Sequence, residues 1–268
     1  MNQRSALRPV RLLLRDVAEK LGLLGIVFRL TERQRARKDV PERDDEGRPL
    51  PPASLMVSVS GEADWQAFLS TGKQHADILN ACARDAGTSF HKAEAILDFG
   101  CGCGRILRHL PPERAAALHG CDINPQAIDW CTEHLPGQFE KTELTPPLPY
   151  SDRQFDLIYL VSVFTHLREK TQQRWAGELA RITKPGGVVL LTFHDEFFWR
   201  LPEFGIDQQT VETQGIVVRN DNLEGSNLLA TYQSRAHLEA LMSEHFECLN
   251  HRPADERLAQ TVAILRRR

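Results

Sequence analysis

Glycine occupies every second position of one short loop, and the flanking residues define the setting of that loop. Residues 95–99 (Ala-Ile-Leu-Asp-Phe) form an apolar run with one acid, Asp98, and the loop Gly100-Cys-Gly-Cys-Gly104 follows at once. Residues 105–110 then read as the start of a helix. An apolar run, a tight turn and a helix are typical of a buried parallel strand in an α/β unit. Because glycine lacks Cβ, the loop backbone can take left-handed φ values and approach a ligand closely.

A second acid ends the next apolar stretch. Asp122 follows residues 115–121 and stands eighteen positions beyond Gly104. A carboxylate at the tip of the neighbouring strand is placed to accept hydrogen bonds from two ribose hydroxyls. The loop and the acid together predict a nucleoside cofactor site. A dinucleotide site is disfavoured, because the G-x-G-x-x-G pattern places its last glycine where Arg105 stands.

From residue 94 onward, apolar runs alternate with amphipathic stretches, as in α/β folds. We expect strands at 95–99, 117–122, 138–141, 155–161, 187–193, 246–249 and 261–265, the last two antiparallel. We expect helices at 64–69, 73–86, 105–110, 125–135, 171–182 and 234–242. Residues 195–230 show little periodicity, and we interpret them as an insertion over the strand ends, where substrates bind.

Several motifs occur in the order and spacing of class I S-adenosylmethionine-dependent methyltransferases. They are the loop Asp98–Gly104, Asp122, Pro146-Pro-Leu-Pro149, Phe155-Asp-Leu-Ile-Tyr159 and the stretch Leu179–Gly187. The chain resembles this family over roughly residues 70–266. The arm Gly47-Arg-Pro-Leu-Pro-Pro52 makes it similar to bacterial stand-alone members, often linked to saccharide or secondary-metabolite pathways. The resemblance implies an α/β fold with a doubly wound, seven-stranded, mostly parallel Rossmann-like sheet and an N-terminal helical extension.

The resemblance also implies S-adenosyl-L-methionine as the cofactor. Asp98 and the glycine loop would hold its methionine end, Asp122 its ribose and Ile123 its adenine. Thr142 and Glu143 are alternatives for the adenine edge. The implied cofactor-binding residues are Asp98, Phe99, Gly100, Cys101, Gly102, Gly104, Asp122, Ile123, Thr142, Glu143 and Val161.

Three polar residues follow two of the expected strands, at the rim where ligands bind in doubly wound sheets. His166 follows the strand at 155–161, and His194 and Asp195 follow the strand at 187–193. An imidazole titrates near neutral pH and can act as a general base, so these three are the candidate catalytic residues. A helix cap or cofactor contact for His166, and a rim hydrogen bond for His194 and Asp195, stay open. The neighbouring aromatic residues would form a lid or a platform for a ring: Phe193, Phe197, Phe198 and Trp199.

We therefore expect O-methylation of a small polar acceptor, such as a sugar hydroxyl. N-methylation of a small molecule and a cofactor-binding but inactive scaffold are alternatives, and an NAD-dependent oxidoreductase is disfavoured. Nucleic acid is not an expected partner, because the chain is close to neutral at −3 and Asp156 does not begin an Asp-Pro-Pro-Tyr type tetrapeptide.

The N-terminal part differs in charge from the rest. Residues 1–38 carry a net charge of +7, which leaves −10 for the remainder. We expect residues 1–54 to form a basic amphipathic helix, at 6–38, and a proline-rich arm, and residues 55–268 to form the methyltransferase domain. The helix would pack on the domain or on a homodimer partner, or would lie on a membrane surface. A transit-peptide-like role is weakened by Asp16 and Glu19.

Six cysteines are too few and too clustered for a disulfide framework in a chain of 268 residues. No apolar stretch reaches the ~20 residues that a bilayer crossing needs. A reducing cytoplasm is the expected compartment. We expect no metal site, because Cys101 and Cys103 have no Cys or Cys/His pair following them at zinc spacing.

Overall fold

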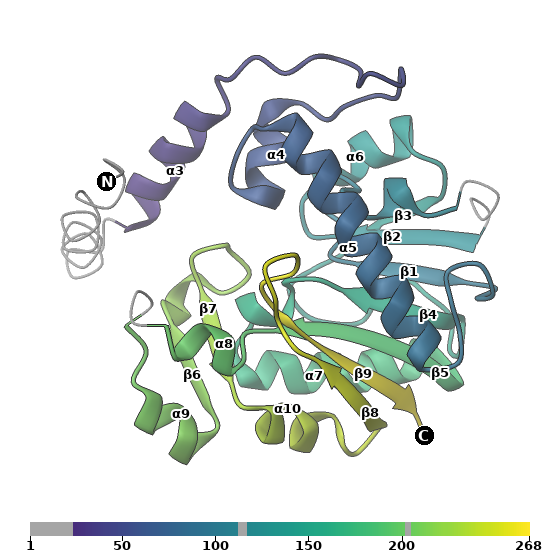
Figure 1. The fold of residues 1–268 in the computed structure, drawn as a ribbon, viewed down its shortest axis with the longest axis vertical. Helices are drawn as coiled ribbons and strands as arrows, with labels where there is room; N and C mark the ends of the chain where they lie inside the picture. Colours follow the sequence, from purple (N-terminus) through teal and green to yellow (C-terminus); the bar gives the residue numbers. More distant parts are fainter. Residues whose placement is uncertain (1–23, 112–116, 202–204) are drawn as a thin grey trace. The chain divides into compact units, whose positions relative to one another are not determined.

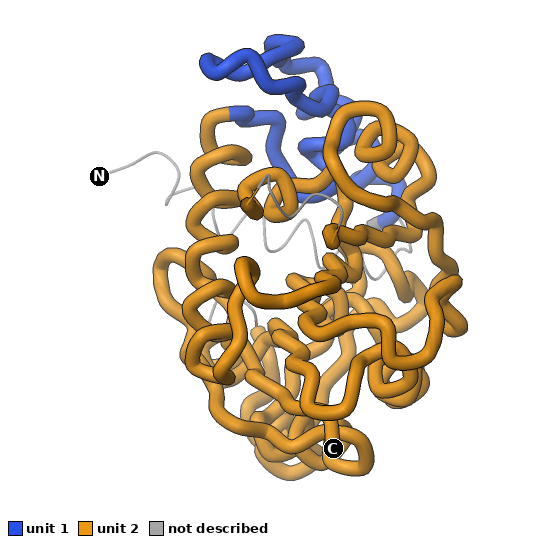
Figure 2. The backbone as a smooth tube through the Cα atoms, turned by 90° about the vertical axis from the view of Figure 1, so that its right-hand side faces the viewer, with its two compact units in different colours: residues 1–65 blue, residues 66–268 orange. Residues whose placement is uncertain are grey.

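The computed structural model describes residues 24–111, 117–201 and 205–268. The chain divides into two compact units, Met1–Trp65 and Gln66–Arg268, which Figure 2 shows in blue and orange. Of the helix expected at 6–38, residues 6–23 lie outside the described residues, and residues 24–35 are helical.

Among its described residues, the first unit contains two helices, α3 (Leu24–Arg35) and α4 (Ala53–Ser60). Ala53 and Val57 of α4 are buried in a small apolar cluster with Ala63. The Arg35 guanidinium donates to the Gly61 carbonyl at 2.7 Å and lies 3.4 Å from the Glu62 carboxylate. These contacts join α3 to the end of α4. Residues 55–59, a short apolar piece of the sequence that follows the proline-rich arm, are therefore helical.

The second unit is built on a seven-stranded sheet in the order β3-β2-β1-β4-β5-β9-β8 (Figure 1). Strands β1 to β5 are parallel, whereas β9 pairs antiparallel with β5 and β8 antiparallel with β9. The strands are β1 (Ile96–Phe99), β2 (Leu118–Asp122), β3 (Gln138–Lys141), β4 (Phe155–Leu160), β5 (Thr183–Phe193), β8 (Phe246–Arg252) and β9 (Thr261–Arg267). The doubly wound, mostly parallel sheet expected from the sequence is confirmed.

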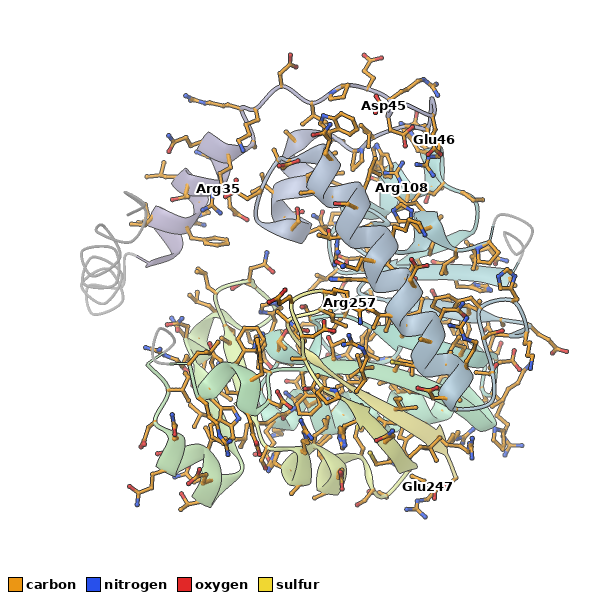
Figure 3. All side chains as sticks on the ribbon, viewed as in Figure 1. Arg35, Asp45, Glu46, Arg108, Glu247 and Arg257 are labelled. Atoms are coloured by element: carbon orange, nitrogen blue, oxygen red, sulfur yellow. The ribbon has the colours of Figure 1, made fainter. Side chains whose placement is uncertain are left out.

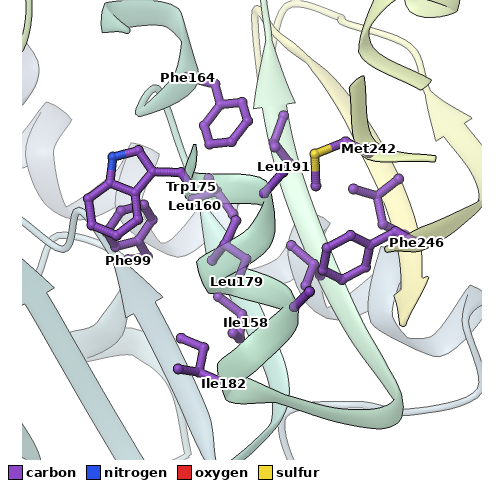
Figure 4. Packing of buried hydrophobic residues seen from close by; sticks show 14 of the residues in the cluster. Phe99, Ile158, Leu160, Phe164, Trp175, Leu179, Ile182, Leu191, Met242 and Phe246 are labelled. Carbon is purple, nitrogen blue, oxygen red and sulfur yellow. The ribbon is translucent and has the colours of Figure 1, made fainter. Parts of the chain in front are cut away.

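Both faces of the sheet are buried, and alternate residues of each strand point to opposite sides. Ile158 and Leu160 of β4 pack with α7 (Glu169–Ile182) and α10 (Arg235–Met242), as Figure 4 shows. Leu157 and Tyr159 pack on the other face with α5 (Trp65–Asp85). Burial on both faces explains why these strands read as continuous apolar runs.

The strand order reverses between β1 and β4, because the chain runs outward from β1 to β3 before it returns to β4. In doubly wound sheets, ligands bind beyond the carboxyl ends of the strands at such a point. The glycine loop follows β1 directly and lies at this position. On the outer side, α6 (Pro125–His134) is capped by Asn124, whose side chain accepts from the Gln126 and Ala127 amides.

Two expectations about local helices are wrong. Residues 105–110 form a short 3₁₀ turn, η1 (Leu107–His109), instead of an α-helix. The two helices expected at 64–69 and 73–86 are one helix, α5, because Gly72 sits inside it and does not end it.

The segment 195–230 has more regular structure than its sequence suggests. It contains α8 (Glu196–Trp199), α9 (Gln208–Gln214), β6 (Ile216–Arg219) and η5 (Asp221–Leu223). Strand β6 pairs antiparallel with β7 (Ala230–Gln233). Trp199, Val211 and Tyr232 are buried together in an apolar cluster of this segment. It is therefore a small folded layer beyond β5.

Among the described residues, no helix combines the length and the apolar character needed to cross a membrane.

Gly72 allows α5 to contact the backbone that follows the glycine loop. A Cβ at position 72 would lie 2.2 Å from the Arg105 carbonyl oxygen. We expect Gly72→Ala to lower the free energy of unfolding by about 1–3 kcal/mol, because the clash outweighs the gain in helix propensity.

Gly177 of α7 is the matched control, since a Cβ there would only touch the His245 ring at 3.7 Å. Gly177→Ala should be neutral or stabilise by up to about 1 kcal/mol. Urea unfolding of both variants measures the difference. Equal effects at the two positions would show that the close approach of α5 is not what requires glycine at 72.

Candidate functional site

The glycine loop is held at the end of β2 by its own backbone. The Gly100 and Cys101 amides both donate to the Cys121 carbonyl, at 2.8 and 3.0 Å. Gly100, Gly102 and Gly104 all have positive φ, between 53° and 80°. The glycines are also required by packing, because a Cβ on Gly100 would lie 2.4 Å from Val163 Cγ2, and one on Gly104 2.2 Å from Leu135 Cδ1.

Asp122 ends β2 with its carboxylate already oriented. One oxygen accepts from the Gly102 amide and the other from the Asn124 amide, both at 2.8 Å. Burial raises the pKa of the Asp122 carboxyl, and the backbone amides oppose that rise. The side chain stays partly exposed, and the next residue, Ile123, is 45% exposed. A fixed carboxylate beside an accessible apolar side chain can bind a group that is polar on one side and flat and apolar on the other.

The segment after β3 lies against this site. The Thr142 amide donates to the Asp122 carbonyl at 3.0 Å, and the Thr142 hydroxyl is turned to the Glu143 carbonyl at 3.2 Å. Thr142 is buried, whereas the Glu143 side chain is exposed. The structure thus brings both candidates for the adenine edge next to Asp122.

Asp98 is buried at the end of β1 and accepts a hydrogen bond from the Tyr159 hydroxyl at 2.9 Å. The two residues are register partners on β1 and β4. Burial raises the pKa of the Asp98 carboxyl to about 7, donation by Tyr159 lowers it, and the nearby Asp122 raises it again. Arg105 is close enough to oppose this rise.

Three other predicted cofactor residues face the protein interior or its edge. The Phe99 ring packs against Trp175 with centroids 4.7 Å apart, so only the Phe99 backbone lies at the loop. The Cys101 thiol donates to the Gly102 carbonyl at 3.5 Å and is buried. Val161 is half-buried and packs on the α5 side of the sheet.

His166 and His194 lie near each other, and both are tethered to one segment. His166 Nδ1 is 2.7 Å from the Leu229 carbonyl, and His194 Nδ1 is 3.2 Å from the Thr231 carbonyl. A carbonyl only accepts, so in each neutral ring Nδ1 carries the proton and Nε2 the lone pair. Burial lowers the pKa of His166, and burial together with His166 lowers the pKa of His194 to about 4.

The two lone pairs have different surroundings. His194 Nε2 accepts from the Gln260 side-chain amide at 3.2 Å, and that amide also donates to the Ser162 hydroxyl at 2.6 Å. Gln260 is held in turn by Thr192, whose hydroxyl donates to Gln260 Oε1 at 2.5 Å. Within the described part of the chain, no hydrogen bond engages His166 Nε2. The two rings thus differ in whether Nε2 already has a hydrogen-bond partner among the described residues.

Asp195 does not pair with either histidine. Its buried carboxylate accepts from the Arg235 guanidinium at 2.9 Å, the Thr261 hydroxyl at 2.6 Å and the Phe197 amide at 3.1 Å. These bonds join α8, α10 and β9.

The expected aromatic group is dispersed. Phe193, the last residue of β5, is buried on the face of the sheet that α7 and α10 cover; Trp199 is buried in the outer layer and Phe197 is exposed. Phe198 and Tyr232 flank the His194 ring, with centroids 4.3 and 5.2 Å from it.

Tyr159 and Gln260 are site residues that sequence reasoning missed. Tyr159 ends the motif Phe155–Tyr159, but its pairing with Asp98 depends on β4 lying next to β1, which the sequence does not show. Gln260 precedes β9 and reaches the rim only because β9 lies next to β5.

A family model described as a methyltransferase domain matches residues 97–191. The chain is 26% identical over 173 residues to a phosphoethanolamine N-methyltransferase of Triticum aestivum. This match covers 58% of this chain and 32% of that protein. It is 29% identical over 129 residues to a 2-methyl-6-phytyl-1,4-hydroquinone methyltransferase of Synechocystis, covering 43% of this chain and 37% of that protein. The chain thus spans about a third of the length of these curated relatives.

The fold is similar to a solved structure of the magnesium protoporphyrin IX methyltransferase of Synechocystis with bound SAH. The TM-score is 0.54 at 14% identity, with 96% of this chain and 99% of that chain covered.

Asp98 makes the stability of the protein depend on pH. Its pKa of about 7 exceeds the ordinary 3.8, so between these values the folded state keeps a proton that the unfolded state releases. Stability due to this group therefore falls as pH rises from about 4 to 7. The side chain in Asp98→Asn stays neutral and still offers Tyr159 an acceptor. The free energy of unfolding of this variant should therefore exceed that of the parent by more at pH 8 than at pH 5.

Urea unfolding at the two pH values measures this, with Asp129→Asn on the exposed side of α6 as the control. An advantage that does not change with pH would contradict the raised pKa of Asp98.

Proposed function

We propose that this chain, in which residues 97–191 form a methyltransferase domain of the class I fold, is an S-adenosylmethionine-dependent methyltransferase that methylates a hydroxyl of a small polar molecule. The bound cofactor supplies an activated methyl group on a sulfonium sulfur, and transfer to a hydroxyl oxygen releases S-adenosylhomocysteine and one proton. The chain's own residues then have three tasks: to hold the cofactor, to orient the acceptor and to accept the proton.

The oriented carboxylate of Asp122 next to exposed Ile123 is the observation that carries the proposal. Two backbone amides hold both carboxylate oxygens, and each oxygen keeps a free direction for a ribose hydroxyl. Ile123 offers an apolar surface for adenine, with Thr142 and Glu143 at its edge. Asp98 lies deeper at the loop, where an ionised carboxylate would attract the cofactor's ammonium group.

The loop residues would contribute to cofactor binding in different ways. Gly100, Gly102 and Gly104 would line the methionine end, with Cys101 contributing its backbone. Phe99 would act through its backbone only, because its ring is committed to Trp175.

We assign the proton-accepting role to His166. A hydroxyl is a weak nucleophile until its proton is removed, and general-base catalysis typically contributes 10²–10⁴-fold. The Leu229 carbonyl holds His166 in the tautomer that has its lone pair on Nε2. His194, whose Nε2 is bonded to Gln260, would orient the rim, and Asp195 would hold the outer layer through Arg235.

The acceptor would bind where β4 and β5 end, against the layer formed by residues 195–230. The two relatives described above are named as methyltransferases of small molecules, which supports a small-molecule acceptor, whereas a relative 34% identical over 105 residues is named as a tRNA methyltransferase of Arabidopsis thaliana. The buried thiols around the loop, Cys101, Cys103, Cys121 and Cys131, favour a reducing compartment such as the cytoplasm.

The cofactor assignment is tested by calorimetric titration with S-adenosylhomocysteine. Asp122→Asn should weaken binding about 10- to 100-fold, because hydrogen bonds to a charged group contribute about 1.5–3 kcal/mol. Asp129→Asn, an exposed acid one turn into α6, should bind like the parent. Equal binding by both variants, or binding of NAD⁺ instead, would refute the assignment.

The base assignment is tested with an acceptor found by screening hydroxylated small molecules with methyl-labelled cofactor. His166→Gln should lower kcat by about 10²–10⁴-fold and leave S-adenosylhomocysteine affinity unchanged. Because burial lowers the pKa of His166, the rate of the parent should fall only at a pH below 6.5, the ordinary pKa of histidine. This fall in rate at low pH should be absent from His166→Gln. A larger loss in His194→Gln than in His166→Gln would move the base to His194.

A further inference from the structure

A thiol, an imidazole and a carboxylate meet outside the site described above. Glu239 comes from α10, and Cys248 and His251 come from β8, the strand at the edge of the sheet. One ligand-type atom from each residue lies within 4.8 Å of the other two. His251 is mostly buried, Cys248 is half-buried and Glu239 is exposed, so the group is open to solvent at one side.

A bulge in β8 creates this arrangement. In a regular strand, residues three apart point to opposite faces. In β8 the register shifts between Cys248 and Asn250: Cys248 pairs with Leu265, and His251 pairs with Ala263. Leu265 and Ala263 are two residues apart on β9 and share one face, so Cys248 and His251 share that face too. Leu249, the extra residue, packs on the opposite face.

Helix α10 covers the face to which these two side chains turn. Its Leu238 and Met242 are buried in the same apolar cluster as Leu265, and the exposed Glu239 directly follows Leu238 in the helix. The Glu239 carboxylate lies 3.5 Å from His251 Nδ1, and the Cys248 thiol lies 3.8 and 3.9 Å from the two ring nitrogens.

We propose that Glu239, Cys248 and His251 bind one zinc ion, which ties the edge strand β8 to α10. Zinc takes sulfur, imidazole nitrogen and carboxylate oxygen at bond lengths of about 2.0–2.3 Å, so tetrahedral ligand atoms lie about 3.3–3.8 Å apart. The separations of His251 from Glu239 and Cys248, 3.5–3.9 Å, are close to these values, and Glu239 and Cys248 lie within 4.8 Å of each other. A thiolate and an imidazole select zinc over magnesium or calcium, which prefer oxygen ligands alone.

On binding, the Cys248 thiol releases its proton and a sulfur–zinc bond forms, while the fourth position is left for water. The proposed zinc site is connected by packing to the rim where His194 and Asp195 lie. The His251 ring contacts Phe193, with centroids 5.9 Å apart, and Phe193 directly precedes His194 and Asp195.

The test uses the full chain, first treated with a chelator and then titrated with Zn²⁺ by calorimetry. We expect one ion per chain. Cys248→Ser should weaken binding at least about a hundredfold, and Glu239→Gln, which changes an exposed side chain, about tenfold. Glu247→Gln is the matched control, because Glu247 lies on the same strand and is exposed to solvent (Figure 3).

Two further readouts separate ligation from folding. Co²⁺ in place of Zn²⁺ should give a sulfur-to-cobalt absorption band in the parent and in Glu247→Gln, but not in Cys248→Ser. Zn²⁺ should raise the unfolding midpoint of the parent and not that of Cys248→Ser. Zinc binding of equal strength in the parent and Cys248→Ser, or no binding at micromolar zinc, would overturn the proposal.

Discussion

The bonds between the glycine loop and the end of β2 are the constraint on which the site depends. Gly100 and Cys101 donate to the Cys121 carbonyl, and Gly102 donates to the Asp122 carboxylate. The loop after β1 thereby determines where the acid of β2 points. Val163 and Leu135 fill the space that a Cβ would need at Gly100 and Gly104. A larger residue in this loop would therefore disturb the carboxylate as well as the turn.

The site holds charges that the fold alone does not favour. Asp98 is fully enclosed and lies near Asp122, and burial raises the pKa of both carboxyls. Removing the charge of Asp98 should stabilise the empty protein, whereas a cationic ligand group would stabilise the ionised form. Such opposition between stability and binding is expected at functional sites.

Much of the fold could be predicted because it rests on local signals. Strands β1, β2 and β4 read as largely apolar runs bounded by turn residues, and Asp98, the glycine loop and Asp122 follow from one motif and its spacing. Errors arose where tertiary contact outweighs local preference. Gly72 looks like a helix break, yet it lets α5 approach Arg105 closely. The layer at 195–230 is held by Trp199, Val211 and Tyr232, whose spacing has no single period.

The partners of the rim histidines could not be predicted, because they come from the C-terminal part of the chain. Gln260 reaches His194 only since β9 inserts antiparallel between β5 and β8. The same pair of strands carries the bulge that turns Cys248 and His251 to one face. A single sequence shows neither which strands are neighbours in the sheet nor where a β-bulge inserts an extra residue into one strand of a pair. The closing hairpin thus does more than complete the sheet: it decides which imidazole keeps a free lone pair at the rim.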